Sequence, residues 1–149
     1  MDMDAELEVH RGLRESQNRY TYFLLGVACA AIALAVTQTQ GTSLSWFQLP
    51  LAAAVLCWGL SFYFGCLNRA YNNAGLLTNV ALCNVRAGRH SDIGTHPQAI
   101  EEGSKILKEI FENQSSKANL YANLQFRFLI AGAVLYVAWH VLEMYLRTL

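Results

Sequence analysis

The chain has 149 residues, of which 54% are hydrophobic and only 15% are charged, with 11 basic and 11 acidic side chains. Ordinary globular proteins carry about 25% charged residues. The balanced charge gives no electrostatic basis for binding nucleic acid through a broad basic surface. The charges are also segregated, because residues 20–68 contain no Asp, Glu, Lys or Arg. This composition predicts an all-α membrane protein rather than a soluble domain.

Residues 1–19 are predicted to form an N-terminal cytoplasmic helix. Glu15 and Arg19 make an i,i+4 pair with the acid first, which is the order that stabilises a helix. No proline separates this segment from the apolar residues that follow. We therefore expect the helix to run directly into the first membrane span.

Residues 20–68 are predicted to form a transmembrane hairpin. Its two apolar runs, about 20–38 and 47–67, each have about the ~20 residues that a helix needs to cross a ~30 Å hydrocarbon core. A short polar link, TQTQGTSLS, separates them. Pro50 falls in the first turn of the second span, where its missing N–H does little harm.

Residues 69–125 are predicted to be a cytoplasmic helical region with a loop at 88–97. Gly88 is placed to end one helix, and Pro97 is placed to begin the next. Apolar and neutral residues recur at helical spacing in the second helix, and we name them the 106–124 stripe. The stripe needs a partner, which can be residues 69–86, the N-terminal helix or another subunit. Its members are Ile106, Leu107, Ile110, Phe111, Gln114, Ala118, Tyr121 and Leu124.

Residues 126–149 contain the third predicted transmembrane helix, at about 126–146. Its charge-free core, residues 128–142, is 15 residues long and therefore shorter than the other two spans. A buried or re-entrant helix is the alternative interpretation. We expect the segment to cross the membrane with its flanking side chains reaching the interfaces.

The distribution of Lys and Arg predicts the topology. Basic residues precede the first span and recur throughout 69–125, whereas the 37–49 link has none. Because loops rich in Lys and Arg stay on the inner side, the N-terminus and residues 69–125 are expected in the cytoplasm. The link between the first two spans and the C-terminus are then expected outside.

A polar stripe on the third span is the main candidate for function. Its members recur three, four or seven residues apart on an otherwise apolar helix, so they share one face. Ionisable groups in a bilayer seek water or partners, so this face can line a pore or a polar seam between subunits. Alternatively, Glu143 and Arg147 simply pair at headgroup level. The polar stripe comprises Gln125, Gly132, Tyr136, His140, Glu143 and Arg147.

Two weaker candidate sites lie in the predicted cytoplasmic parts. His90, Asp92 and His96 have side chains that can bind zinc. No fourth ligand is evident and nothing fixes their geometry, so we expect a polar turn, with no metal and no cofactor. Four arginines can converge around an anionic ligand in an oligomer, or can serve as solvated charges and anchors to the inner leaflet. These are Arg11, Arg14, Arg86 and Arg89.

No catalytic motif is present, since there is no phosphate-binding Gly-rich loop, no nucleophile elbow and no Ser–His–Asp arrangement. We therefore expect no enzyme. One copy with three spans cannot enclose a transport path, whereas a symmetric ring of copies can. The first hypothesis is a homo-oligomeric membrane channel or pore that its cytoplasmic helices control. The alternative is a small membrane scaffold or accessory subunit that binds another protein through residues 97–125.

This layout resembles the small membrane effectors of bacterial anti-phage defence. These include the two-span effectors associated with nucleotide second messengers and the channel-forming effector of the Hailong system. In such families a helical cytosolic part, to which 2–19 and 69–125 would correspond here, keeps a membrane channel closed. The resemblance covers the arrangement of nearly the whole chain and involves no diagnostic motif, so it transfers no ligand residues. It implies a bacterial inner-membrane protein gated by a nucleotide or oligonucleotide, which is a deoxyadenylate oligomer in the Hailong case, or by a partner protein.

Overall fold

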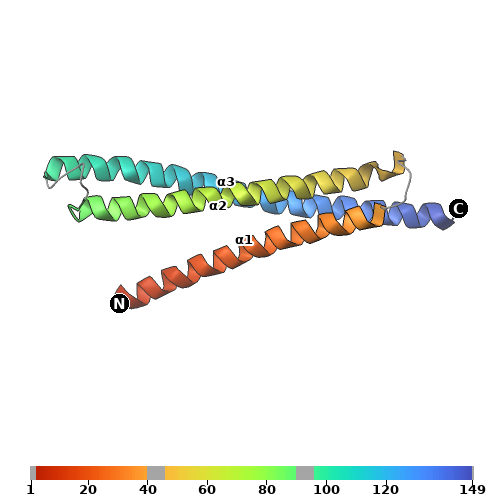
Figure 1. Cartoon of the computed structure of the whole chain (residues 1–149), viewed down its shortest axis with the longest axis horizontal. Helices are drawn as coiled ribbons and strands as arrows, with labels where there is room; N and C mark the ends of the chain where they lie inside the picture. Colours follow the sequence, from red (N-terminus) through yellow and green to blue (C-terminus); the bar gives the residue numbers. More distant parts are fainter. Residues whose placement is uncertain (1–2, 40–45, 90–95, 149) are drawn as a thin grey trace. The chain divides into compact units, whose positions relative to one another are not determined.

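The computed structural model describes residues 3–39, 46–89 and 96–148, with the side chains of all but residues 3–11, 13, 14 and 147. The described residues form helices and no strands, which confirms the all-α prediction. Three long helices follow one another along the described chain, as can be followed in Figure 1. They are α1 (Met3–Thr39), α2 (Leu49–Arg86), which a short 3-10 helix η1 (Trp46–Gln48) precedes, and α3 (Pro97–Thr148).

Each long helix is long and apolar enough to cross a membrane. The candidate spans lie within Glu15–Thr39, Trp46–Arg86 and Pro97–Leu146, with mean hydropathies of 1.9, 1.7 and 1.6 in their most apolar windows. The prediction of three spans is therefore confirmed in length and composition, and the chain has the architecture of a multi-pass membrane protein. The helices are continuous from each predicted span into its polar neighbour, as expected for α1. The third span also has no internal break of the kind that a re-entrant turn requires.

The ends of α2 and α3 follow from local sequence. Gly88 adopts a positive φ of 65°, which glycine reaches without steric cost. The Gly88 N–H donates to the Val85 carbonyl at 3.0 Å, and the Arg89 N–H donates to the Asn84 carbonyl at 2.9 Å. This pair of bonds is a Schellman motif, which satisfies the last carbonyls of α2. At the start of α3 the His96 carbonyl accepts the first helical bond, and Pro97 follows it.

The chain divides into two compact units. Unit 1 comprises Met1–Gly65 and Asn123–Leu149, and unit 2 comprises Cys66–Ala122. In unit 1 the three helices bury a core that consists largely of alanine, leucine and tryptophan. Small alanines allow the helix backbones to approach closely, as in other membrane bundles. The core residues are Leu24, Ala28, Ala35, Leu51, Ala54, Trp58, Leu129 and Trp139.

Unit 2 is an antiparallel pair made by the end of α2 and the beginning of α3, drawn in green and teal in Figure 1. The Thr78 hydroxyl donates to the Gln114 side-chain carbonyl at 2.9 Å. The rings of Tyr71 and Tyr121 stack with centroids 5.3 Å apart. Residues 69–86 are therefore a partner of the 106–124 stripe through Gln114 and Tyr121. Ile106 and Ile110 of the same stripe remain exposed.

Candidate functional site

The polar stripe of α3 lies largely inside unit 1. Its members Gln125 and Gly132 are buried, and Tyr136 and Glu143 are half-buried. Their contacts are made with α1 and α2 of the same chain. The stripe therefore forms a polar seam within one subunit, and His140 is its most exposed described member. The side chain of Arg147 lies outside the described residues, so its predicted pairing with Glu143 stays a prediction.

The first contact of the seam joins Ser61 of α2 to Gln125 of α3. The Ser61 hydroxyl donates to the backbone carbonyl of Gln125 at 2.8 Å, and both residues are buried. The Gln125 side-chain Nε2 is also buried and finds no hydrogen-bond partner among the described residues. A Cβ at Gly65 would lie 2.7 Å from this Nε2, so the absent side chain of Gly65 makes room for the Gln125 amide. The two helices thus meet closely around an incompletely satisfied polar group, which is costly in a low-dielectric setting.

The second contact packs Trp58 of α2 against Gly132 of α3. A Cβ at Gly132 would lie 2.5 Å from the indole Nε1 and 3.1 Å from the Ala54 backbone carbonyl. No larger residue fits there without displacing the ring or the helix. The indole in turn lies beside the Tyr136 ring, with centroids 5.7 Å apart. Gly132 lies on the polar stripe by its spacing but brings no polar group. Its role there is to leave room for the Trp58 ring.

The third contact joins α3 to α1. The Tyr136 hydroxyl donates to the side-chain carbonyl of Gln38 at 2.8 Å. Around it the rings of Tyr136, Trp139 and His140 lie close together, with centroid separations of 5.9–6.5 Å. A hydrogen bond between side chains of different helices is the kind of contact that holds membrane helices together. Gln38 and Tyr136 therefore fix the end of α1 against α3.

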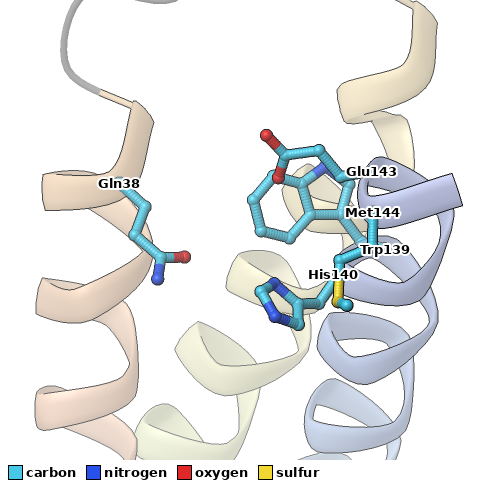
Figure 2. A pocket seen from close by; sticks show the side chains of 5 residues that line it. All are labelled: Gln38, Trp139, His140, Glu143 and Met144. Carbon is cyan, nitrogen blue, oxygen red and sulfur yellow. The ribbon is translucent and has the colours of Figure 1, made fainter. Parts of the chain in front are cut away.

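Two cavities lie beside this contact. The larger, of about 210 Å³, is shown in Figure 2, where Gln38 of α1 faces Trp139 and His140 across the space, and Glu143 lies at one end. Met144 completes its lining. The smaller cavity, of about 140 Å³, shares three of these residues. It is lined by Gln38, Thr39, Phe47, Gln48, Trp139, Leu142, Glu143 and Leu146.

Chemically, the cavities combine one carboxylate, one imidazole, side-chain amides and aromatic faces. This set can bind or pass a cation. It does not form a metal centre of the usual kind, because no group of three His, Cys, Asp or Glu side chains gathers in the described part of the chain. His90 and Asp92 lie outside the described residues, and His96 is exposed at the start of α3.

The predicted arginine cluster is placed only in part. Arg86 and Arg89 are exposed at the end of α2. The side chains of Arg11 and Arg14 lie outside the described residues, so an anionic site formed by all four stays a prediction. Elsewhere in unit 2, the Lys117 ammonium lies 5.6 Å from the centroid of the Tyr71 ring.

Two residues of the seam, Gln38 and Ser61, could not be assigned their partners from the sequence. Gln38 falls at the predicted end of the first span, where the TQTQGTSLS link begins, and the structure shows that it lies inside α1 and is the partner of Tyr136. Ser61 and Gly65 have the four-residue spacing that lets helices approach closely, but this spacing is common by chance and did not indicate the bond to Gln125. The informative pattern was a glutamine within one turn of the end of an uncharged span, because such a group needs a partner in lipid.

The chain matches no protein-family model, and no significantly similar curated protein or solved structure was found.

Proposed function

We propose that the protein is a homo-oligomeric channel or pore-forming effector of the bacterial inner membrane. Its N-terminus and residues 69–125 lie in the cytoplasm, its C-terminus lies outside, and the cytoplasmic helices control opening. The stimulus is a nucleotide, an oligonucleotide or a partner protein, and the role is anti-phage defence. The observation that carries the proposal is the polar seam from Gln125 to Glu143, which is embedded in otherwise apolar spans.

A polar seam in a membrane bundle calls for a functional explanation. Polar and ionisable side chains within spans are costly and usually mark paths for ions or substrates. Apolar contacts like those of its alanine- and leucine-rich core would hold unit 1 together without the free-energy cost of placing polar groups in lipid. The amide, hydroxyl, imidazole and carboxylate groups along the seam offer successive sites to a permeating ion.

A single copy keeps this seam closed. Trp58 and Tyr136 fill the middle of unit 1, and Tyr136 is bonded to Gln38. Three helices cannot surround a water-filled path, so a conducting state needs several copies around an axis. Opening would then separate α1 from α3 and turn part of the seam toward that axis.

This mechanism is tested by removing one hydroxyl. Tyr136→Phe keeps the ring but deletes the hydrogen bond to Gln38. Purified protein in dye-loaded liposomes is expected to leak faster with Tyr136→Phe than with the wild type, because the closed state loses a contact. Tyr145→Phe, on an exposed part of the same helix, is the matched control and should behave like the wild type.

Induced expression in bacteria gives the parallel readout in a living membrane. A dye for membrane potential should report depolarisation that is stronger for Tyr136→Phe than for Tyr145→Phe. If no variant depolarises cells or releases dye from liposomes, the channel proposal is wrong.

A membrane scaffold is the second candidate, and the exposed side chains of Ile106 and Ile110 in unit 2 favour it. Water-exposed isoleucines on a helix face are typical of a protein-binding surface. The double variant Ile106→Ser/Ile110→Ser should then lose a co-purifying protein while the membrane potential is unaffected. Retention of every co-purifying protein would contradict this candidate.

A further inference from the structure

We propose that the two cavities beside Gln38 form a binding site for an ammonium head group, a positively charged nitrogen that carries alkyl substituents. The inference deepens the function proposed above, and it rests on that proposal only in taking this end of unit 1 to lie at the membrane surface. The nitrogen occupies the larger cavity, and the substituents extend into the smaller one.

The charge of the site comes from Glu143. Its side chain lines both cavities, and among the residues whose side chains the structure describes, no Lys or Arg lines either of them. A half-buried carboxylate without a basic neighbour among the described lining residues favours a cationic ligand. A carboxylate has about four lone-pair sites, so it can accept a ligand contact in addition to those it makes within the chain.

The aromatic side chains define which kind of cation fits. Trp139 lines both cavities, and the His140 ring lies beside it with centroids 6.3 Å apart. Figure 2 shows both rings on one wall, with the Gln38 amide opposite, and Met144 also lines this cavity. Alkylated ammonium groups bind to aromatic faces through cation–π contacts, with the strongest contribution from tryptophan. Small, strongly hydrated metal ions prefer oxygen ligands in larger number.

The volumes set the size of the ligand. The larger cavity of about 210 Å³ is well above the ~30 Å³ share of one water and below the ~300 Å³ at which drug-sized pockets begin. An ammonium group with a few small substituents fits this range. Phe47, Leu142 and Leu146 line the smaller cavity, which therefore suits an attached carbon chain. Such a ligand can be a lipid head group or a free organic amine.

The test uses choline and its uncharged analogue 3,3-dimethylbutan-1-ol. The full-length protein is reconstituted in nanodiscs of phosphatidylglycerol, which lacks an ammonium group, and titrated by calorimetry. Choline should bind saturably, and the neutral analogue should bind at least about tenfold more weakly, which corresponds to ~1.4 kcal/mol. Equal binding of both compounds, or no choline binding, would overturn the proposal.

Variants locate the site. Glu143→Gln should weaken choline binding about tenfold, because it removes the negative charge. Trp139→Phe should weaken it by a smaller factor, because phenylalanine keeps part of the cation–π attraction. Glu112→Gln, an exposed carboxylate of unit 2, is the matched control and should leave binding unchanged. Wild-type affinity in a folded Glu143→Gln protein, judged by circular dichroism, would refute the assignment.

Nanodiscs that contain phosphatidylcholine distinguish the two sources. Loss of apparent choline affinity in them supports a lipid head group, and unchanged affinity supports a free amine. Failure of this site is also separable from failure of the channel. Choline binding without dye release would contradict the channel alone, and dye release without choline binding would contradict the site alone.

Discussion

Units 1 and 2 contain parts of the same two helices, α2 and α3, yet they are held together differently. Among the described residues, unit 1 buries eight hydrophobic side chains in one core, whereas the buried hydrophobics of unit 2 are Leu82, Val85 and Ala118. Unit 2 relies on a hydroxyl–amide bond, a stacked tyrosine pair and a lysine over a ring. The packing chemistry therefore changes along each helix without a break in the backbone.

The exposed surfaces differ in the same way. Unit 1 presents large apolar side chains outward, among them Phe23, Leu56 and Val134, each more than 60% exposed. The α3 segment of unit 2 instead exposes acidic and basic residues in alternation, such as Glu101, Lys105 and Glu109. A surface of the first kind suits lipid and one of the second kind suits water. For α3, this difference agrees with the proposal that its unit 1 part lies in lipid and its unit 2 part in water.

The largest predicted effect concerns the close contact in unit 1. Gly132→Ala should destabilise the protein by about 1–3 kcal/mol, because the new methyl group overlaps the Trp58 ring and approaches a backbone carbonyl. Thermal unfolding in detergent, followed by circular dichroism, measures it. Gly59→Ala, where an added Cβ would have no atom within 4 Å, should not destabilise the protein. Equal stability of the two variants would show that α2 and α3 are not so close.

A smaller effect is expected at the buried hydroxyl. Ser61→Ala removes the bond to the Gln125 carbonyl and should cost about 0.5–1 kcal/mol, in the range of interhelical bonds in membrane proteins. The same unfolding experiment applies. Ser115→Ala, at an exposed position of α3, provides the control and should be neutral. A loss of stability in Ser115→Ala as large as that in Ser61→Ala would contradict the predicted difference.

Unit 2 should respond to a glycine substitution with the opposite sign. A Cβ at Gly75 would meet the Phe111 ring at 3.7 Å, which is an ordinary contact. Gly75→Ala should therefore stabilise the protein by up to about 1 kcal/mol through its higher helix propensity. A destabilised Gly75→Ala protein would mean that the helices of unit 2 pack as tightly as those of unit 1.

The smallest effect is expected at the surface of α1. Glu15 and Arg19 form an exposed ion pair with an N···O distance of 2.6 Å. Glu15→Gln should change stability by less than about 0.5 kcal/mol, since water and salt screen such pairs. Unfolding at low and high salt measures the change, and a large salt-dependent loss would show that the pair is not solvated.

The helices were predictable because their signals are local. The uncharged residues 20–68 indicate two spans whatever their partners, and Gly88 and Pro97 mark helix ends through the backbone alone. The seam was only half predictable, because the polar stripe shows which face of α3 is polar but not what that face meets. The bond between Tyr136 and Gln38 depends on how two helices distant in sequence are rotated and aligned, which periodicity does not determine.

The partner of the 106–124 stripe was likewise not determined by its spacing. Its spacing identified a face that needs a partner and left three candidates open. Thr78 lies opposite Gln114, and the ring of Tyr71 stacks on Tyr121. Neither contact has a signature in one helix alone, so choosing among the candidates required the packed structure.

Cysteine labelling tests most directly the central claim that unit 1 lies in lipid and unit 2 in the cytoplasm. Cys29 of unit 1 and Cys83 of unit 2 are both exposed on the protein, so burial does not explain a difference between them. Variants in which Cys29 or Cys83 is the single remaining cysteine are treated with a membrane-impermeant maleimide. We predict fast labelling of Cys83 in inverted vesicles, protection of Cys83 in intact cells, and protection of Cys29 in both. Labelling of Cys29 as fast as that of Cys83, or of Cys83 only in intact cells, would contradict the account.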